Sequence, residues 1–477
     1  MERAARLRLV TIVLWLSAQG CSDPPLELWH TEKLTEEFTA VKSREVRSFD
    51  DYRELEQRLF AQLEEKVYAR TETGPSQELV RYSSGSAADP RNDQPDWNHS
   101  FEWIPAAPVG GVLLLHGMSD SPYSLRALAE TLRQRGYWVV GLRLPGHGTT
   151  PSGLKHITMH DMSAAVRLAM GHLASTPGKK PIHMVGYSTG ASLALDYALD
   201  AVDGKASPAP ASLVLISPAI RIHPSAALAR FKDGLSVVPG LGRLAWLQIL
   251  PEFDPYKYNS FATNAGNVVH RLTRSVDGRV VARARAQSEG RLPPILVFKS
   301  TVDSTVTTEA VVDRLLALLP PHRHELVLFD INRSAVRKGL LVSDPGPLTQ
   351  RLMGDASLPF AVTFVTNESP TTNAVVVRRK AALSADVSDN ASLGLAWPAG
   401  VISLSHVALP IPPDDPLYGR RPPENEDTLF LGEMAMQGER GLLELPADWL
   451  LRMRYNPFYA LIEQRVLGWF EPTKEDH

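Results

Sequence analysis

Two glycines flank a serine in the stretch Gly186-Tyr-Ser188-Thr-Gly190, which has the spacing G-x-S-x-G. The apolar run 182–185 before it is short enough for a buried strand, and the alanine-rich stretch 191–198 after it is typical of a helix. A turn this tight leaves no room for a Cβ at either glycine, and it projects the Ser188 hydroxyl into open space. The pattern therefore predicts a serine nucleophile. The alternative is an ordinary glycine-rich turn with a solvent-facing serine.

A serine hydroxyl has too high a pKa to attack an ester carbonyl unaided. It needs a neutral imidazole that takes its proton and a carboxylate that orients the imidazole. The N-terminus of the helix after Ser188 offers free N–H groups and the positive end of a dipole to a developing oxyanion. A serine nucleophile at this position therefore requires an acid and a histidine that the fold brings to the same place.

Short apolar runs alternate with helical stretches through the middle of the chain, which predicts a parallel sheet with right-handed crossovers. The expected strands lie near 111–118, 138–144, 182–185, 213–217, 294–298 and 325–329. The expected helices lie near 125–135, 159–174, 191–198 and 307–319.

Three motifs in this region resemble the α/β-hydrolase superfamily: His116-Gly117, Pro145-Gly-His147-Gly148 and the G-x-S-x-G turn. Within it, the chain is most similar to the monoacylglycerol lipase and carboxylesterase branch. The resemblance covers about 110–329 continuously and returns near His406 and the C-terminal helix. It implies a mostly parallel central sheet flanked by helices, and the chain order nucleophile, acid, histidine.

Asp303 is the candidate acid. The strand at 213–217 is followed by no carboxylate, whereas Asp303 lies in the loop after the strand at 294–298 and matches the acid position of the family. The glycine usually found before that acid is replaced here by Ser300-Thr301. Asp303 could instead be only a helix N-cap, and Asp330, after the last core strand, is the reserve candidate.

Fourteen histidines are present, and four follow the candidate acid: His322, His324, His406 and His477. The histidine of the family comes after the last core strand, which two of these precede, and the final residue is expected to be frayed. The elimination leaves His406, in the run 401–410, which we interpret as a strand entering a proline-marked loop. The alternative is a structural histidine.

Residues 330–400 separate the last core strand from His406, although the histidine loop of the family normally follows that strand almost at once. The insert contains the strand-like runs 360–365 and 374–377. We expect extra strands that either extend the sheet or fold over its rim.

The oxyanion needs two backbone N–H donors aimed at one point. Thr189, directly after the nucleophile, supplies one, and the resemblance implies that Met118 supplies the other. His116 and His147 are then expected to shape loops, because the mechanism of the superfamily uses a single histidine. No metal and no organic cofactor is implied.

The superfamily inserts its cap between two core strands, here at 222–292. The apolar residues of this segment could line an acyl-chain tunnel or simply pack the cap onto the sheet. Before the core, residues 21–100 are expected to form a tether and an N-terminal helical segment, with Ser48 as a helix N-cap.

Residues 1–20 have the pattern of an export signal, with three arginines followed by the apolar run 9–16, which is too short to span a bilayer. Ser17-Ala-Gln-Gly-Cys21 resembles a bacterial lipoprotein processing site, at which Cys21 would carry the lipid. We expect a cell-envelope protein anchored by lipid, at the outer membrane and facing the periplasm. A plain secretory signal or an uncleaved anchor are the alternatives.

Composition excludes several classes of protein. Cys21 is the only cysteine among 477 residues, so neither a disulfide within the chain nor a Cys-type zinc site can form. The net charge of −3 offers no basic surplus for a phosphate backbone, which argues against a nucleic-acid partner.

The sequence thus predicts an α/β-hydrolase core over 101–221 and 293–477. Its predicted activity is cleavage of small or lipid-like carboxylic esters, through a Ser188–Asp303–His406 triad and an acyl-serine intermediate. The same groups would serve an acyltransferase, a thioesterase or a peptidase. A rival from another class is an inactive fold that acts as an envelope binding or scaffold protein.

Overall fold

The structure is a computed structural model. It describes residues 24–175, 178–220, 242–286, 290–303, 306–335, 341, 344–424, 428–432 and 453–471. The export signal with Cys21, the first part of the expected cap up to residue 241, and His477 lie outside the described residues. The expectations made for these segments stay predictions.

Within the described residues, ten strands form one sheet in the order β1-β3-β2-β4-β5-β8-β9-β10-β11-β12. Seven neighbours, from β3 to β10 in that order, run parallel. β1 (Phe101–Trp103) pairs antiparallel with β3 at one end of the sheet, and β10, β11 and β12 form antiparallel pairs at the other. The parallel strands are β2 (Gly111–Leu115), β3 (Trp138–Leu142), β4 (Ile182–Tyr187), β5 (Ser212–Ile216), β8 (Ile295–Ser300), β9 (Glu325–Phe329) and β10 (Ala361–Asn367). The predicted mostly parallel central sheet is confirmed.

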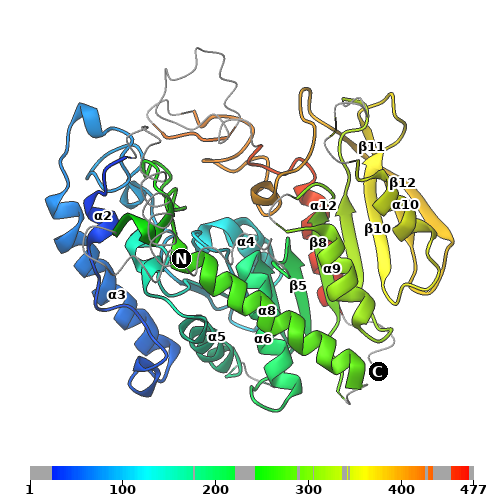
Figure 1. Ribbon diagram of the computed structural model, residues 1–477, viewed down its shortest axis with the longest axis horizontal. Helices are drawn as coiled ribbons and strands as arrows, with labels where there is room; N and C mark the ends of the chain where they lie inside the picture. The colour runs from blue at the N-terminus through cyan, green and yellow to red at the C-terminus, as the bar shows by residue number, and fades with distance from the viewer. Residues whose placement is uncertain are drawn as a thin grey trace, which may run out of the picture.

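Helices cover both faces of the sheet, and its central strands are accordingly buried and mostly apolar. Because side chains alternate along a strand, Leu113 and Leu115 of β2 join one core cluster, whereas Val112 and Leu114 join another. The first cluster includes side chains of α5 (Met159–Leu173), α6 (Thr189–Val202), α8 (Thr263–Ala286) and α9 (Thr308–Arg314). The second includes side chains of α4 (Arg126–Gln134) and α12 (Tyr459–Phe470). Figure 1 shows α8 crossing the front of the sheet.

The insert before His406 extends the sheet and does not fold over its rim. After α10 (Gly346–Gly354), β10 pairs in parallel with β9, and β11 (Ala374–Lys380) and β12 (Val387–Ala396) follow as an antiparallel meander. Figure 1 shows these strands at the right-hand end of the molecule. Two of them match the strand-like runs in the sequence. β12 was not predicted, because its polar run Val-Ser-Asp-Asn has no apolar alternation.

The strand predicted just before His406 is wrong. Residues 401–405 are irregular, and the carbonyls of Val401, Ile402 and Leu404 accept hydrogen bonds from Asn332 and Ser300 and form no strand ladder. Asn332, just after β9, donates its backbone N–H to Ile402 and its side-chain amide to Val401. Ser300 at the end of β8 donates its hydroxyl to the carbonyl of Leu404. These bonds hold the chain that follows the insert beside the carboxyl ends of β8 and β9.

The N-terminal segment packs directly on the core. Helix α3 (Phe49–Lys66) begins at the N-cap Ser48, whose hydroxyl accepts the Asp51 N–H. Its residues Phe49 and Tyr52 join the same core cluster as β2 and α5. Among the described residues, no helix combines the length and apolar character that a bilayer crossing requires.

A buried arginine holds this segment to the sheet. Arg143, just after β3, donates to Glu56 of α3 at 2.7 Å and to Glu37 at 3.0 Å. Arg143 and Glu56 are both almost fully buried, so each charge depends on its partners.

We predict that Glu56→Gln lowers the free energy of unfolding by about 3 kcal/mol, because it leaves Arg143 with only Glu37 as a charged partner. Glu54→Gln, on the exposed face of the same helix, is the matched control and should change it by less than about 0.5 kcal/mol. Urea unfolding followed by tryptophan fluorescence measures both. Equal effects of the two variants would contradict the assignment.

Candidate active site

The turn at Ser188 has the geometry that its sequence predicts. β4 ends at Tyr187, α6 begins at Thr189, and Ser188 between them has φ 54° and ψ −114°. A positive φ is unfavourable for a residue with a Cβ, so the turn is strained and must be held by its surroundings. One such restraint is the Ser188 N–H, which donates to the Ile216 carbonyl of β5 at 2.9 Å.

The two glycines of the motif are required by close packing. A Cβ on Gly186 would lie 2.4 Å from the backbone of Ala191. A Cβ on Gly190 would lie 2.1 Å from the carbonyl oxygen of Leu115, at the end of β2. Neither contact can relax by moving a side chain, because the opposing atoms belong to the backbone. The glycines let α6 start directly against β2 and β4.

The structure brings Asp303 and His406 together. His406 Nδ1 lies 2.8 Å from Asp303 Oδ2, and the other carboxylate oxygen accepts the Val306 N–H at 3.1 Å. The N-cap of α9 is Thr307, whose side chain accepts the Ala310 N–H. Asp303 is therefore not the N-cap of that helix, and it stands beside the imidazole that the sequence paired with it.

His406 also lies beside the serine turn. It begins the 3₁₀ turn His406–Ala408, and its ring centroid is 5.4 Å from that of Tyr187, the residue just before Ser188. The hydrogen bonds of the described residues do not include one from the Ser188 hydroxyl to His406. Such bonds are often long in a site without substrate and tighten when substrate binds. With Nδ1 turned to Asp303, Nε2 is the ring nitrogen left for the serine.

Asp330 and His324, two other candidates of the C-terminal half, lie elsewhere. Asp330, the reserve acid, pairs with Arg333 at 2.9 Å and accepts the Thr366 hydroxyl. His324 accepts the backbone N–H of Ile295, at the start of β8 and thus at the opposite end of that strand from Asp303.

Lys299 is a member of this site that the sequence analysis missed. It lies in β8, its side chain is 0% exposed, and its Nζ contacts Asp303 Oδ2. Burial lowers the pKa of Lys299 to about 8, against the opposing effect of the Asp303 charge. Burial alone would raise the pKa of Asp303, but the His406 hydrogen bond and the charges of His406 and Lys299 hold it well below its usual value. The available signal was a lysine in an apolar strand, four residues before the candidate acid.

The loop after β2 lies against the serine turn, as the oxyanion hole requires. A Cβ on Gly117 would lie 3.3 Å from the Ser188 Cβ, so Gly117 is packed against the serine turn. Met118, the next residue, therefore also lies close to that turn. Within the described part of the chain, neither the Met118 nor the Thr189 N–H donates to another protein group. Both remain available to an oxyanion, and their role there stays a prediction.

Charged and backbone contacts fix this loop from the side of the expected cap. Lys257 Nζ lies 2.7 Å from Asp120 Oδ2, and the Tyr258 N–H donates to the Ser119 carbonyl at 2.8 Å. Ser119 has a positive φ of 62° and needs such support. No local pattern predicts this contact, because Asp120 and Lys257 are 137 residues apart in the chain.

His116 and His147 hold backbone loops. His116 Nε2 accepts the Leu144 N–H at 3.0 Å, while its Nδ1 lies 2.8 Å from the Gly117 carbonyl. His147 Nδ1 lies 2.9 Å from the Pro145 carbonyl. Burial pushes the pKa of His116 well below its usual value and that of His147 to about 4, so both rings are neutral at physiological pH.

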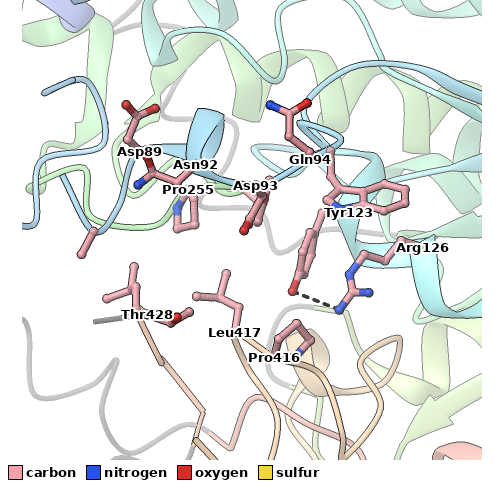
Figure 2. A pocket seen from close by; sticks show the side chains of 14 residues that line it. Asp89, Asn92, Asp93, Gln94, Tyr123, Arg126, Pro255, Pro416, Leu417 and Thr428 are labelled. Carbon is pink, nitrogen blue, oxygen red and sulfur yellow. Dashed lines mark hydrogen bonds between the residues drawn. The ribbon is translucent and has the colours of Figure 1, made fainter. Parts of the chain in front are cut away.

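A pocket of about 430 Å³ opens between the N-terminal segment, the start of α4 and the chain after His406. Figure 2 shows Tyr123 and Arg126 on one side and Leu417 on another. Arg126 donates to the Tyr123 hydroxyl at 3.2 Å and to Asp415 at 2.8 Å. No three His, Cys, Asp or Glu side chains are grouped as a metal site in the part of the chain that the structure describes.

Residues 106–328 match the sequence family described as "Serine aminopeptidase, S33". This segment runs from just before β2 to the end of β9 and contains Ser188 and Asp303. The chain has the α/β-hydrolase fold. The strand order, the serine turn and the match of residues 106–328 agree on this fold, and His406 lies beyond the matched segment.

Several lipolytic enzymes are similar to parts of this chain. The thermostable monoacylglycerol lipase of Bacillus sp. (strain H-257) is 40% identical over 85 residues, which is 18% of this chain and 33% of that lipase. The monoacylglycerol lipase of Paleococcus ferrophilus is 19% identical with a TM-score of 0.38, over 49% of this chain and 88% of that one. A monoglyceride lipase of Saccharomyces cerevisiae is 16% identical with a TM-score of 0.38, over 48% and 82%.

We predict that Gly190→Ala destabilises the protein by about 3 kcal/mol or more, because the new methyl group meets the backbone of β2. Gly171→Ala is the matched control, since Gly171 is also helical and has nothing near its Cβ position. It should leave the protein as stable or raise its stability by up to about 1 kcal/mol. Thermal unfolding of the two variants measures the contrast, and a Gly190→Ala variant of wild-type stability would refute the packing argument.

Proposed function

We propose that this protein is a serine hydrolase that cleaves carboxylic esters of small or lipid-like substrates. The observation that carries the proposal is the contact of His406 with Asp303 beside the strained turn of Ser188. A strained, glycine-flanked serine next to a carboxylate–imidazole pair has a clear use as a nucleophile. The match of the segment around Ser188 to a serine hydrolase family supports it.

In the proposed reaction the Ser188 oxygen attacks the ester carbonyl carbon while its proton passes to Nε2 of His406. Asp303 accepts the Nδ1–H and stabilises the imidazolium that forms. The oxyanion receives the backbone N–H groups of Met118 and Thr189, the latter at the start of α6. His406 then protonates the departing alcohol, which leaves an acyl ester on Ser188. Water, deprotonated by His406, releases the acid and restores the serine.

Asp303 is suited to this role because it stays ionised throughout. The groups around it hold its pKa well below the usual range of a carboxyl, although it is buried. An ionised carboxylate keeps the proton of His406 on Nδ1, and this leaves Nε2 unprotonated and able to act as a base.

The proposed substrate class is the ester. A stretch of 85 residues in this chain is 40% identical to a monoacylglycerol lipase. This similarity supports carboxylic esters with an apolar acyl chain as the substrates. The family description names an aminopeptidase, so peptide amides are the second candidate. Both reactions pass through an acyl-serine, and the leaving group distinguishes them.

We predict that Ser188→Ala abolishes labelling by a fluorophosphonate probe and lowers the kcat for a p-nitrophenyl ester by about 10⁴-fold or more, because the nucleophile is lost. Ser163→Ala, which removes a buried hydroxyl from α5, is the matched control and should keep both. Retained hydrolysis by a folded Ser188→Ala variant would refute the nucleophile.

A paired set of substrates then decides the substrate class. An ester series of increasing acyl length is compared with aminoacyl anilides at equal enzyme concentration, and only faster ester turnover supports an esterase. Burst kinetics with an added acceptor alcohol identify an acyltransferase. A folded wild-type chain that the probe does not label would instead support the inactive binding or scaffold protein.

We also propose that the protein is anchored in the bacterial envelope by lipid on Cys21, at the outer membrane and facing the periplasm. The support is the sequence pattern of residues 1–21.

We predict that the protein made in a Gram-negative bacterium incorporates labelled fatty acid and sediments with membranes, and that Cys21→Ser loses both properties, because the thiol is the attachment point. Ser188→Ala is the control and should stay in the membrane fraction. A Cys21→Ser variant that still carries labelled lipid would contradict the anchor.

A further inference from the structure

Lys299 is a buried cation at the centre of the proposed catalytic group. Its side chain is 0% exposed, and its Nζ contacts Asp303 Oδ2, the same oxygen that lies 2.8 Å from His406 Nδ1. A lysine is rarely buried completely unless a carboxylate pairs with it. Since the position lies in an apolar strand, a hydrophobic residue would fill it at less cost to stability, and the lysine calls for a functional reason.

The contact ties the acid of a loop to the rigid sheet. Lys299 belongs to β8, whereas Asp303 follows it in the loop before α9. Lys299 and His406 meet at Oδ2, and the Val306 N–H meets Oδ1. Both carboxylate oxygens are therefore held, and their orientation toward His406 is set by a strand.

We propose that Lys299 is a positioning residue of the catalytic group: it fixes Asp303 Oδ2 toward His406, and its positive charge opposes protonation of His406, so that the base stays available at lower pH. The inference rests on the proposed function, because it assigns Lys299 to the proton transfer from Ser188. Lys299 acts through Asp303 and does not touch the substrate.

The other titratable and charged groups around the site come from the neighbouring elements. They are Tyr187 of β4, Glu309 of α9, Asp330 with Arg333 after β9, Asp120 with Lys257 beside the oxyanion loop, and Asp254 with Arg454. Three of these sets are ion pairs whose opposite charges largely cancel at a distance. Glu309 acts on Lys299 in the same direction as Asp303 and favours its charged form.

Lys299 carries its positive charge in the pH range in which the proposed base must work. Burial lowers the pKa of Lys299 to about 8, so the side chain is protonated through the neutral and acidic range. His406 can act as a base only in its neutral form. A positive charge next to the Asp303–His406 pair disfavours a second one on the imidazole, so removing the lysine should make the base protonate at higher pH.

The test is the pH dependence of Ser188 labelling by a fluorophosphonate probe on the full chain, which needs no knowledge of the natural substrate. In Lys299→Met the midpoint of the acidic limb should move to higher pH by about one unit. Labelling at about pH 6 should then fall about tenfold, with a smaller loss on the alkaline plateau. Lys299→Gln, which keeps a polar contact without the charge, should show the same shift and serves if the methionine variant does not fold.

Lys380→Met is the matched control. Lys380 is also fully buried, on β11, and its Nζ donates to the carbonyls of Asp355 and Ser384. Its loss should lower stability without moving the acidic limb. The inference is overturned if a folded Lys299 variant keeps the wild-type midpoint or shifts it to lower pH. A wild-type chain that is not labelled at Ser188 would instead refute the proposed function, so the two failures are distinguishable.

Discussion

The contact between Asp303 and His406 joins residues that are 103 positions apart in the chain, and the candidate active site depends on it. It forms because two chain segments end at the same edge of one parallel sheet. β8 delivers Lys299 and Asp303 there. His406 arrives only after the chain has built β10, β11 and β12 and returned, guided by Ser300 and by the Asn332 that follows β9. The insert lengthens the sheet while its two ends stay close together.

The opposing side of the site depends on a second set of long-range contacts. The strained Ser188 turn is held between β2 and β5, and the loop that carries Met118 is held through Asp120 by Lys257. Buried His116 supports the same loop from below by accepting a hydrogen bond from the backbone after β3. The strain at Ser188 and the order around it thus come from the same packing, which fixes the geometry of the turn.

Much of this arrangement could be predicted from the sequence. The parallel sheet followed from apolar runs alternating with helices, and the order of nucleophile, acid and histidine followed from a resemblance. The prediction was weakest where the pattern was weakest. β12 is too polar to show strand alternation, and the apolar run 401–405 resembles a strand although hydrogen bonds from Asn332 and Ser300 hold it as a loop. Lys299 was not predicted as a site residue, because a lysine in an apolar strand does not by itself indicate which carboxylate it contacts.

The sequence by itself determined the strained serine turn, because steric exclusion at Gly186 and Gly190 is a local property that neighbouring residues specify. It also determined which residue types were available as acid and base. The tertiary structure alone decided that Asp303 and not Asp330 meets His406, and that a buried lysine shares the same carboxylate oxygen. These pairings are set by the order of strands in the sheet and by the return path of the insert. They depend on distances across the sheet, which residue spacing along the chain does not encode.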